Sequence, residues 1–306
     1  MRGRSQLNTE IGRTLFREFR SQILTYCIWD DIEPAAFLRD WGEDLATKTP
    51  YQGFVEPGDT LTDYCMDFAH IRAQLRLGTI STINAIAAAS RIENDMIRWG
   101  VETPQVAKMW RFQETRLPDS PHFWNGTVHT FENQNAPTSS TWNFWRSMRI
   151  LLSRTQESLA QRVHLPPAER ERQQMHIRTV RRQMADDICA TVPVALGHAN
   201  KAIAQCTLIT AYGSIWPLFF AGTCALERVE EKWWMVGAEH VAAHKRYAAS
   251  AAAAQAAWVI GRMEYISREI GLRWAEGVAA VLKGDFSIHW DLLPEGEVDV
   301  DGNAGV

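Results

Sequence analysis

The side chains best suited to polarise a bound substrate are an arginine and a histidine that stand close to tryptophans in the sequence. Arg149 follows Trp142 and Trp145, and His240 follows Trp234. Guanidinium and imidazole groups are strong hydrogen-bond donors, and a donor to a substrate carbonyl withdraws electron density and lowers the barrier of a cycloaddition. Arg149 and His240 are therefore the candidate catalytic residues.

Aromatic rings are frequent, with 13 tryptophans in 306 residues. Tyr212, Trp216 and Phe220 recur at four-residue spacing and would share one face of a helix. Inward-facing rings of this kind form an apolar wall with a few N–H and hydroxyl donors, typical of a pocket for a bulky apolar ligand. For any single ring, ordinary helix packing is the alternative. The candidate substrate-binding residues are Trp142, Trp145, Tyr212, Trp216, Phe220 and Trp234.

An acidic segment, Asp30 to Glu33, resembles the motif with which class I terpene cyclases hold Mg²⁺ against a substrate diphosphate. The segment from Asn94 to Glu102 has the spacing of the second metal motif of that family, but Arg98 stands where a hydroxyl ligand is needed. Pro34 also ends the helix directly after the first motif. Solvated helix surfaces are the simpler interpretation of both segments.

A histidine pair, His240 and His244, has the i, i+4 spacing that can bind a metal ion from one helix face. Glu239 precedes the pair, but it does not occupy the zinc-protease position, and no third ligand is evident. The sequence also contains no glycine-rich phosphate loop and no G-x-S-x-G motif. We therefore expect neither a metal site nor another cofactor.

Composition limits the partners and the compartment. The net charge of −4 argues against a large nucleic-acid footprint, and no apolar run reaches the length of a membrane span. No apolar segment follows the basic N-terminus, and five widely spaced cysteines give no disulfide framework. We expect a cytoplasmic protein whose partner is a small apolar substrate, with a homodimer as an open alternative.

Apolar residues at three- and four-residue spacing predict helices, and no stretch alternates like a strand. Pro193 should break one helix, and residues 117–136 should form a long loop of functional importance or high mobility. The fold class is all-α: one multi-helix domain over residues 1–293 with a ligand-sized apolar pocket, then a disordered acidic tail over 294–306. The helices are expected near 9–29, 35–46, 60–77, 80–99, 103–115, 138–163, 167–191, 202–226, 227–247, 248–270 and 272–283.

Four segments carry a family resemblance: AHIRAQLRLGTI (69–80), TWNFWRSMRILLSRTQ (141–156), MADDICATVPVALG (184–197) and IWPLFFAGTCALERV (215–229). In this order they resemble the fungal-specific transcription factor domain, the helical region that normally follows a zinc-cluster DNA-binding motif. The resemblance implies an all-helical fold and a fungal source, and it brings no established catalytic residues. The six-cysteine zinc cluster is missing, because Cys27 is the sole cysteine among the first 60 residues. We therefore expect no DNA binding by this chain.

Two classes of function follow. The first is a stand-alone enzyme of fungal secondary metabolism: a cofactor-independent cyclase or pericyclase that folds a terpenoid or polyketide polyene for an intramolecular Diels–Alder reaction. The alternative is a regulator, a ligand-sensing or dimerising domain that would be nuclear. A Mg²⁺-dependent terpene cyclase is a second alternative.

Overall fold

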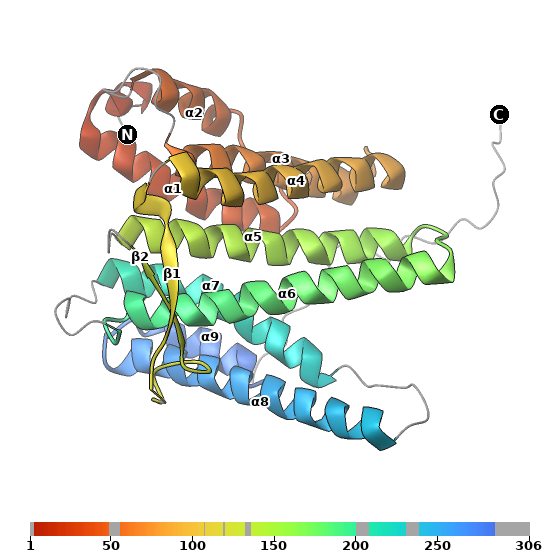
Figure 1. The fold of residues 1–306 in the computed structure, drawn as a ribbon. Coiled ribbons are helices and arrows are strands. Elements are labelled where there is room, and N and C mark those ends of the chain that lie inside the picture. The colour runs from red at the N-terminus through yellow and green to blue at the C-terminus, as the bar shows by residue number, and fades with distance from the viewer. Residues whose placement is uncertain are drawn as a thin grey trace, which may run out of the picture. The chain divides into compact units, whose positions relative to one another are not determined.

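The computed structural model consists almost entirely of helices (Figure 1). In the part of the chain that it describes, 79% is helix and 4% is strand, which confirms the all-α fold class. Within this part, no helix combines the length and the apolar character that crossing a membrane requires. The predicted tail, 294–306, lies outside the described residues, which are 3–48, 56–106, 108–118, 120–131, 136–199, 208–230 and 239–284.

The chain divides into two compact units, which are described separately here. The first contains residues 1–101, 154–174 and 289–306. Its described elements are the 3₁₀ helix η1 (Gly3–Asn8), α1 (Glu10–Trp29), α2 (Phe37–Lys48), α3 (Pro57–Leu77) and most of α4 (Thr82–Val106).

Helix ends in the first unit follow local chemistry. The Thr9 side chain accepts a hydrogen bond from the backbone N–H of Gly12 at 3.0 Å and so caps α1. Pro57 opens α3, where its missing N–H costs nothing, and Gly78 ends that helix with a left-handed φ of 67°.

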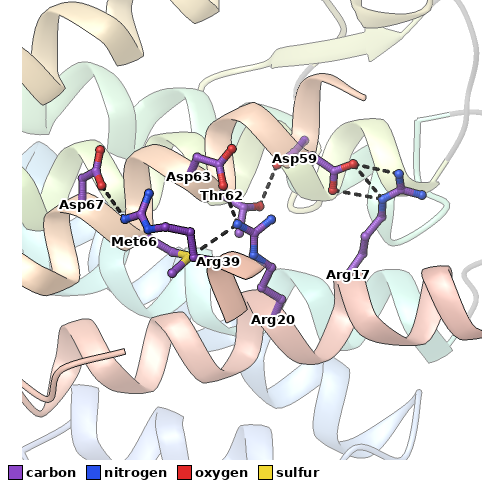
Figure 2. Close-up of polar contacts among 9 residues, drawn as sticks. Arg17, Arg20, Arg39, Asp59, Thr62, Asp63, Met66 and Asp67 are labelled. Carbon is purple, nitrogen blue, oxygen red and sulfur yellow. Dashed lines mark hydrogen bonds and ion pairs between the residues drawn. The ribbon is translucent and has the colours of Figure 1, made fainter. Parts of the chain in front are cut away.

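A row of three aspartates on α3 holds α1 and α2 in place (Figure 2). Arg17 donates to Asp59 at 2.7 Å, and Arg39 of α2 donates to Asp67 at 2.7 Å. Between them the fully buried Arg20 binds Asp63. The same guanidinium lies against α2, where only a glycine leaves it room: a Cβ on Gly42 would lie 2.7 Å from its nearest nitrogen.

The second unit contains residues 102–153 and 175–288. Its remaining described elements are the 3₁₀ helix η2 (Lys108–Trp110), strands β1 (Phe112–Arg116) and β2 (Thr127–Phe131), and helices α7 (Leu208–Glu230), α8 (Glu239–Arg268) and α9 (Trp274–Leu282). Helices α5 (Ala136–Gln161) and α6 (Pro167–Ala195) belong to it in most of their length, but their residues 154–161 and 167–174 belong to the first unit. Helices α7, α8 and α9 pack together. A Cβ on Gly222 of α7 would lie 2.8 Å from Leu282 of α9 and 3.1 Å from Val259 of α8.

The strand pair corrects the prediction of a helix over 103–115 and of a long loop over 117–136. Strands β1 and β2 pair antiparallel, with Phe112 opposite Phe131 and Arg116 opposite Thr127. Strand β1 is only five residues long, and four of them are polar and exposed. Such a segment has no apolar periodicity that could distinguish a strand from a helix.

The predicted break at Pro193 is also wrong, because α6 continues to Ala195. Proline removes one hydrogen bond and crowds the preceding turn, but only two helical residues follow it here. Gly197, with a φ of 76°, then ends the helix. The backbone N–H of His198 donates to the Pro193 carbonyl at 2.8 Å.

Candidate functional site

Trp142 and Trp145, two of the predicted substrate-binding residues, lie together on α5. Their rings meet edge to face with centroids 5.4 Å apart, and both side chains are buried. The Trp142 indole N–H donates to the backbone carbonyl of Trp110 at 3.1 Å. Buried indoles need such a partner, so this ring is held in a defined orientation.

Arg149, the predicted catalytic arginine, is half-buried beside these rings. Its guanidinium carbon lies 5.0 Å from the centroid of Trp145, within cation–π distance. One of its terminal nitrogens lies 3.8 Å from the sulfur of Met184 on α6. The structure thus places Arg149 with Trp145, as expected from their shared helix.

A second arginine of α5, Arg146, was not predicted as a site residue. It is the centre of a cluster whose other members are Phe112, His129, Trp142, Asn143, Asp187 and Thr191. It is 1% exposed, and its guanidinium carbon lies 5.4 Å from the ring centroid of Phe112 and 5.7 Å from that of Trp142. It donates to the side-chain oxygens of Asn143 at 2.9 Å and Thr191 at 2.6 Å. Its position four residues after a tryptophan was the available signal in the sequence.

Two titratable side chains complete the surroundings of Arg146. The Nδ1 atom of His129 on β2 lies 3.2 Å from a terminal nitrogen of the guanidinium, and a carboxylate oxygen of Asp187 lies 4.0 Å from its Nε. Arginine can only donate, so Nδ1 is the acceptor and the imidazole carries its proton on Nε2. His129 lies on a strand that the sequence did not predict, which is why it was missed.

Burial sets the charges of this cluster. Desolvation lowers the pKa of Arg146 to about 10, and Asp187 only partly opposes this effect. Burial, together with the charge of Arg146, lowers the pKa of His129 to about 3. Burial also raises the pKa of Asp187, against the attraction of Arg146. At neutral pH the cluster therefore contains a cationic arginine and a neutral histidine.

The other predicted rings form a second group on α7. Trp216 packs with Phe220 at 6.2 Å and with Trp274 of α9 at 5.7 Å, and Tyr212 lies 5.9 Å from Trp274. Phe220 is fully buried and Tyr212 is 40% exposed. The structure thus brings Tyr212, Trp216 and Phe220 together and adds Trp274 to them.

Helices α5 and α7 approach closely at one point. A Cβ on Gly213 would lie 3.1 Å from the hydroxyl oxygen of Ser140. Two predicted site residues have no described side-chain position: Trp234 lies outside the described residues, and of His240 only the helical backbone in α8 is described.

Three carboxylates of the two suspected magnesium motifs have protein partners. Asp31 pairs with the buried Arg72 at 2.6 Å, Glu33 lies 2.7 Å from His70, and Asp95 pairs with Arg98 at 3.2 Å. Among the residues with described positions, no three His, Cys, Asp or Glu side chains are grouped so that they could hold a metal ion.

The fold and the site define an all-α protein with a buried arginine–aromatic cluster. The chain matches no known family model, and no curated protein and no solved structure is significantly similar to it.

Proposed function

We propose that the chain is a helical regulatory domain of the fungal transcription factor type, which senses a ligand or binds a partner protein and does not bind DNA by itself. The four segments that carry the resemblance support this proposal, because polar side-chain contacts connect them, directly in two cases and through a glutamine of α8 in the third. A signature that builds the fold, and that brings no established catalytic residues, is what a regulatory domain needs.

The contact that carries the proposal is the hydrogen bond from Arg146 to Thr191 at 2.6 Å, which joins the second segment to the third. The first segment is joined to the second in the same way, by Arg72, which donates to Thr155 at 2.9 Å. All four side chains are almost fully buried. Buried polar groups require partners, so each pair fixes packing within its own unit, Arg72 with Thr155 in the first and Arg146 with Thr191 in the second.

The fourth segment is connected through a buried glutamine of α8. Arg228 donates to the Oε1 atom of Gln255 at 2.9 Å, and the Nε2 atom of Gln255 donates to Asp186 of the third segment at 2.8 Å. Gln255 has no exposed surface, so both ends of its amide are used inside the protein. The apolar pocket that ligand sensing requires is part of the proposal, and the rings of α5 and α7 would line it.

A cofactor-independent pericyclase is the second candidate, and the contact between Arg149 and Trp145 favours it. A guanidinium held 5.0 Å from an aromatic ring is a fixed donor beside an apolar surface. Bound to the carbonyl of a polyene, it would activate the dienophile while the rings hold the reactive conformation.

Deleting the gene and measuring both transcripts and metabolites separates the two candidates. The regulator predicts that transcripts of its target genes change and that no biosynthetic precursor accumulates. The pericyclase predicts unchanged transcripts and an accumulated precursor, which the purified protein converts even in EDTA. This second result would overturn the regulatory proposal.

Complementing the deletion strain with variants sharpens the comparison. Arg149→Ala should restore normal transcripts if the domain is a regulator, whereas the pericyclase requires the precursor to persist. Arg268→Ala is the matched control, because Arg268 is exposed on α8 and should behave as the wild type in both cases.

A further inference from the structure

Arg262 of α8 is a half-buried cation without a matching anion. Among the described residues no carboxylate pairs with it, and its Nε atom is buried without a hydrogen-bond partner. The half-buried Arg17 and the buried Arg72 both pair with aspartates. An unpaired cation in a partly desolvated position is unfavourable, so an anion bound beside Arg262 would be stabilised.

Two histidines from distant parts of the chain meet at this arginine. One terminal nitrogen of Arg262 lies 3.0 Å from Nδ1 of His122, in the connection between β1 and β2. The His122 ring stacks on His198, which follows α6, with centroids 4.0 Å apart. The Nε2 atom of His198 is buried and has no partner. The cluster therefore holds two buried nitrogens, Nε of Arg262 and Nε2 of His198, that have no hydrogen-bond partner.

Aromatic side chains hold this group in place. The Arg262 guanidinium lies 5.7 Å from the ring of Trp258 and 5.6 Å from that of Tyr265. The Trp258 indole donates to the backbone carbonyl of Pro121 at 3.2 Å and so attaches the strand connection to α8. Three separate segments thus bring one cationic side chain, two histidines and two aromatic rings together.

We propose that Arg262 and His198 bind the carboxylate of a small organic acid, with one carboxylate oxygen for each unpaired nitrogen. A carboxylate offers two acceptors and the missing negative charge, and charge-assisted bonds of this kind are strong. Trp258 and Tyr265 provide apolar surface beside it for an aromatic or aliphatic acid. The site is separate from the clusters on α5 and α7, and its occupation does not depend on the regulatory role proposed above.

Proton uptake is a specific signature of this binding. Burial, His122 and Arg262 lower the pKa of His198 to about 4, and burial and Arg262 lower the pKa of His122. Within the described part of the chain, His198 contacts the rings of His122 and Tyr265 and is near the charge of Arg262. A bound carboxylate raises the pKa of His198, so binding should tighten as the pH falls from about 7 to about 5.

Calorimetric titration of the purified chain with benzoate tests the site, with benzamide as the neutral analogue of the same shape. We expect saturable binding of benzoate, about tenfold or more weaker binding of benzamide, and a similar loss for Arg262→Gln. Arg268→Gln is the matched control on the same helix and should bind as the wild type. Equal binding of benzoate and benzamide, or unchanged binding by Arg262→Gln, would overturn the proposal.

A second variant distinguishes the loss of a binding contact from a folding defect. His198→Asn should melt near the wild-type temperature, bind benzoate more weakly and lose the strengthening at low pH. Binding that keeps its full pH dependence in His198→Asn would contradict the assignment of His198, as would the absence of benzoate binding to the wild-type protein.

Discussion

His129 and Arg146 form a buried pair in which a permanent cation donates a hydrogen bond to a neutral imidazole across 3.2 Å. Both side chains are at most 2% exposed. The pair is stable only while the imidazole stays neutral, because protonation would place two cations in contact inside the protein.

Acidification should therefore destabilise the fold through His129. Its pKa falls from 6.5 in the unfolded chain to about 3 in the folded one. Between these values the unfolded chain binds more protons, so stability is lost as the pH falls through this window. Urea unfolding between about pH 7 and pH 4 should show a weaker pH dependence for His129→Asn than for the wild type.

The wild type must be compared with His129→Asn, because Asp31 changes the stability with pH in the direction opposite to His129. Burial raises its pKa to about 6, against the attraction of Arg72, so its contribution to stability is present at low pH and is lost as the pH rises. This contribution is common to both proteins and cancels in their difference. Identical pH profiles for the wild type and His129→Asn would contradict the prediction.

Removing the charge of Arg146 should be severely destabilising. Arg146→Met leaves the buried acceptors of Asn143 and Thr191 unused and removes the cation 4.0 Å from Asp187, and each buried acceptor left without a donor costs about 1–3 kcal/mol. The free energy of unfolding measured in urea checks this. Arg149→Met, on the same helix and only half-buried, should cost less than half as much.

Gly12 is expected to tolerate no side chain. A Cβ there would lie 1.9 Å from the backbone carbonyl oxygen of Gln6 in η1, and backbone cannot move aside as a flexible side chain can. Gly12→Ala should lower the unfolding free energy by about 1–3 kcal/mol. The matched control is Gly261→Ala in α8, where a Cβ meets nothing within 4 Å and alanine should stabilise the helix by about 0.5–1 kcal/mol.

The contact between Gly222 and Leu282 predicts a compensating pair of mutations. Gly222→Ala should destabilise by about 1–3 kcal/mol, because the new Cβ would lie 2.8 Å from a methyl of Leu282. In Leu282→Ala that methyl is absent, so adding Gly222→Ala should cost much less. A double-mutant cycle of thermal or urea unfolding measures the coupling, and strictly additive effects would contradict the proposed contact.

Local spacing was sufficient to predict most of the helices. The predicted helix over 9–29 is α1 at Glu10–Trp29, capped by Thr9. Such predictions succeed because apolar periodicity and capping depend on residues within one or two turns of each other. The hairpin was not predicted, because its strands are only five residues long and each is stabilised by pairing with the other strand.

The identity of the central arginine could not come from the sequence. Trp142 precedes Arg146, and Trp145 precedes Arg149, by the same four residues, so the two pairs look alike along α5. The sequence determined that each arginine would lie beside a tryptophan. Only the tertiary structure decided which one is buried, because His129 from β2 and Thr191 from α6 reach Arg146, and both lie far from it in the chain.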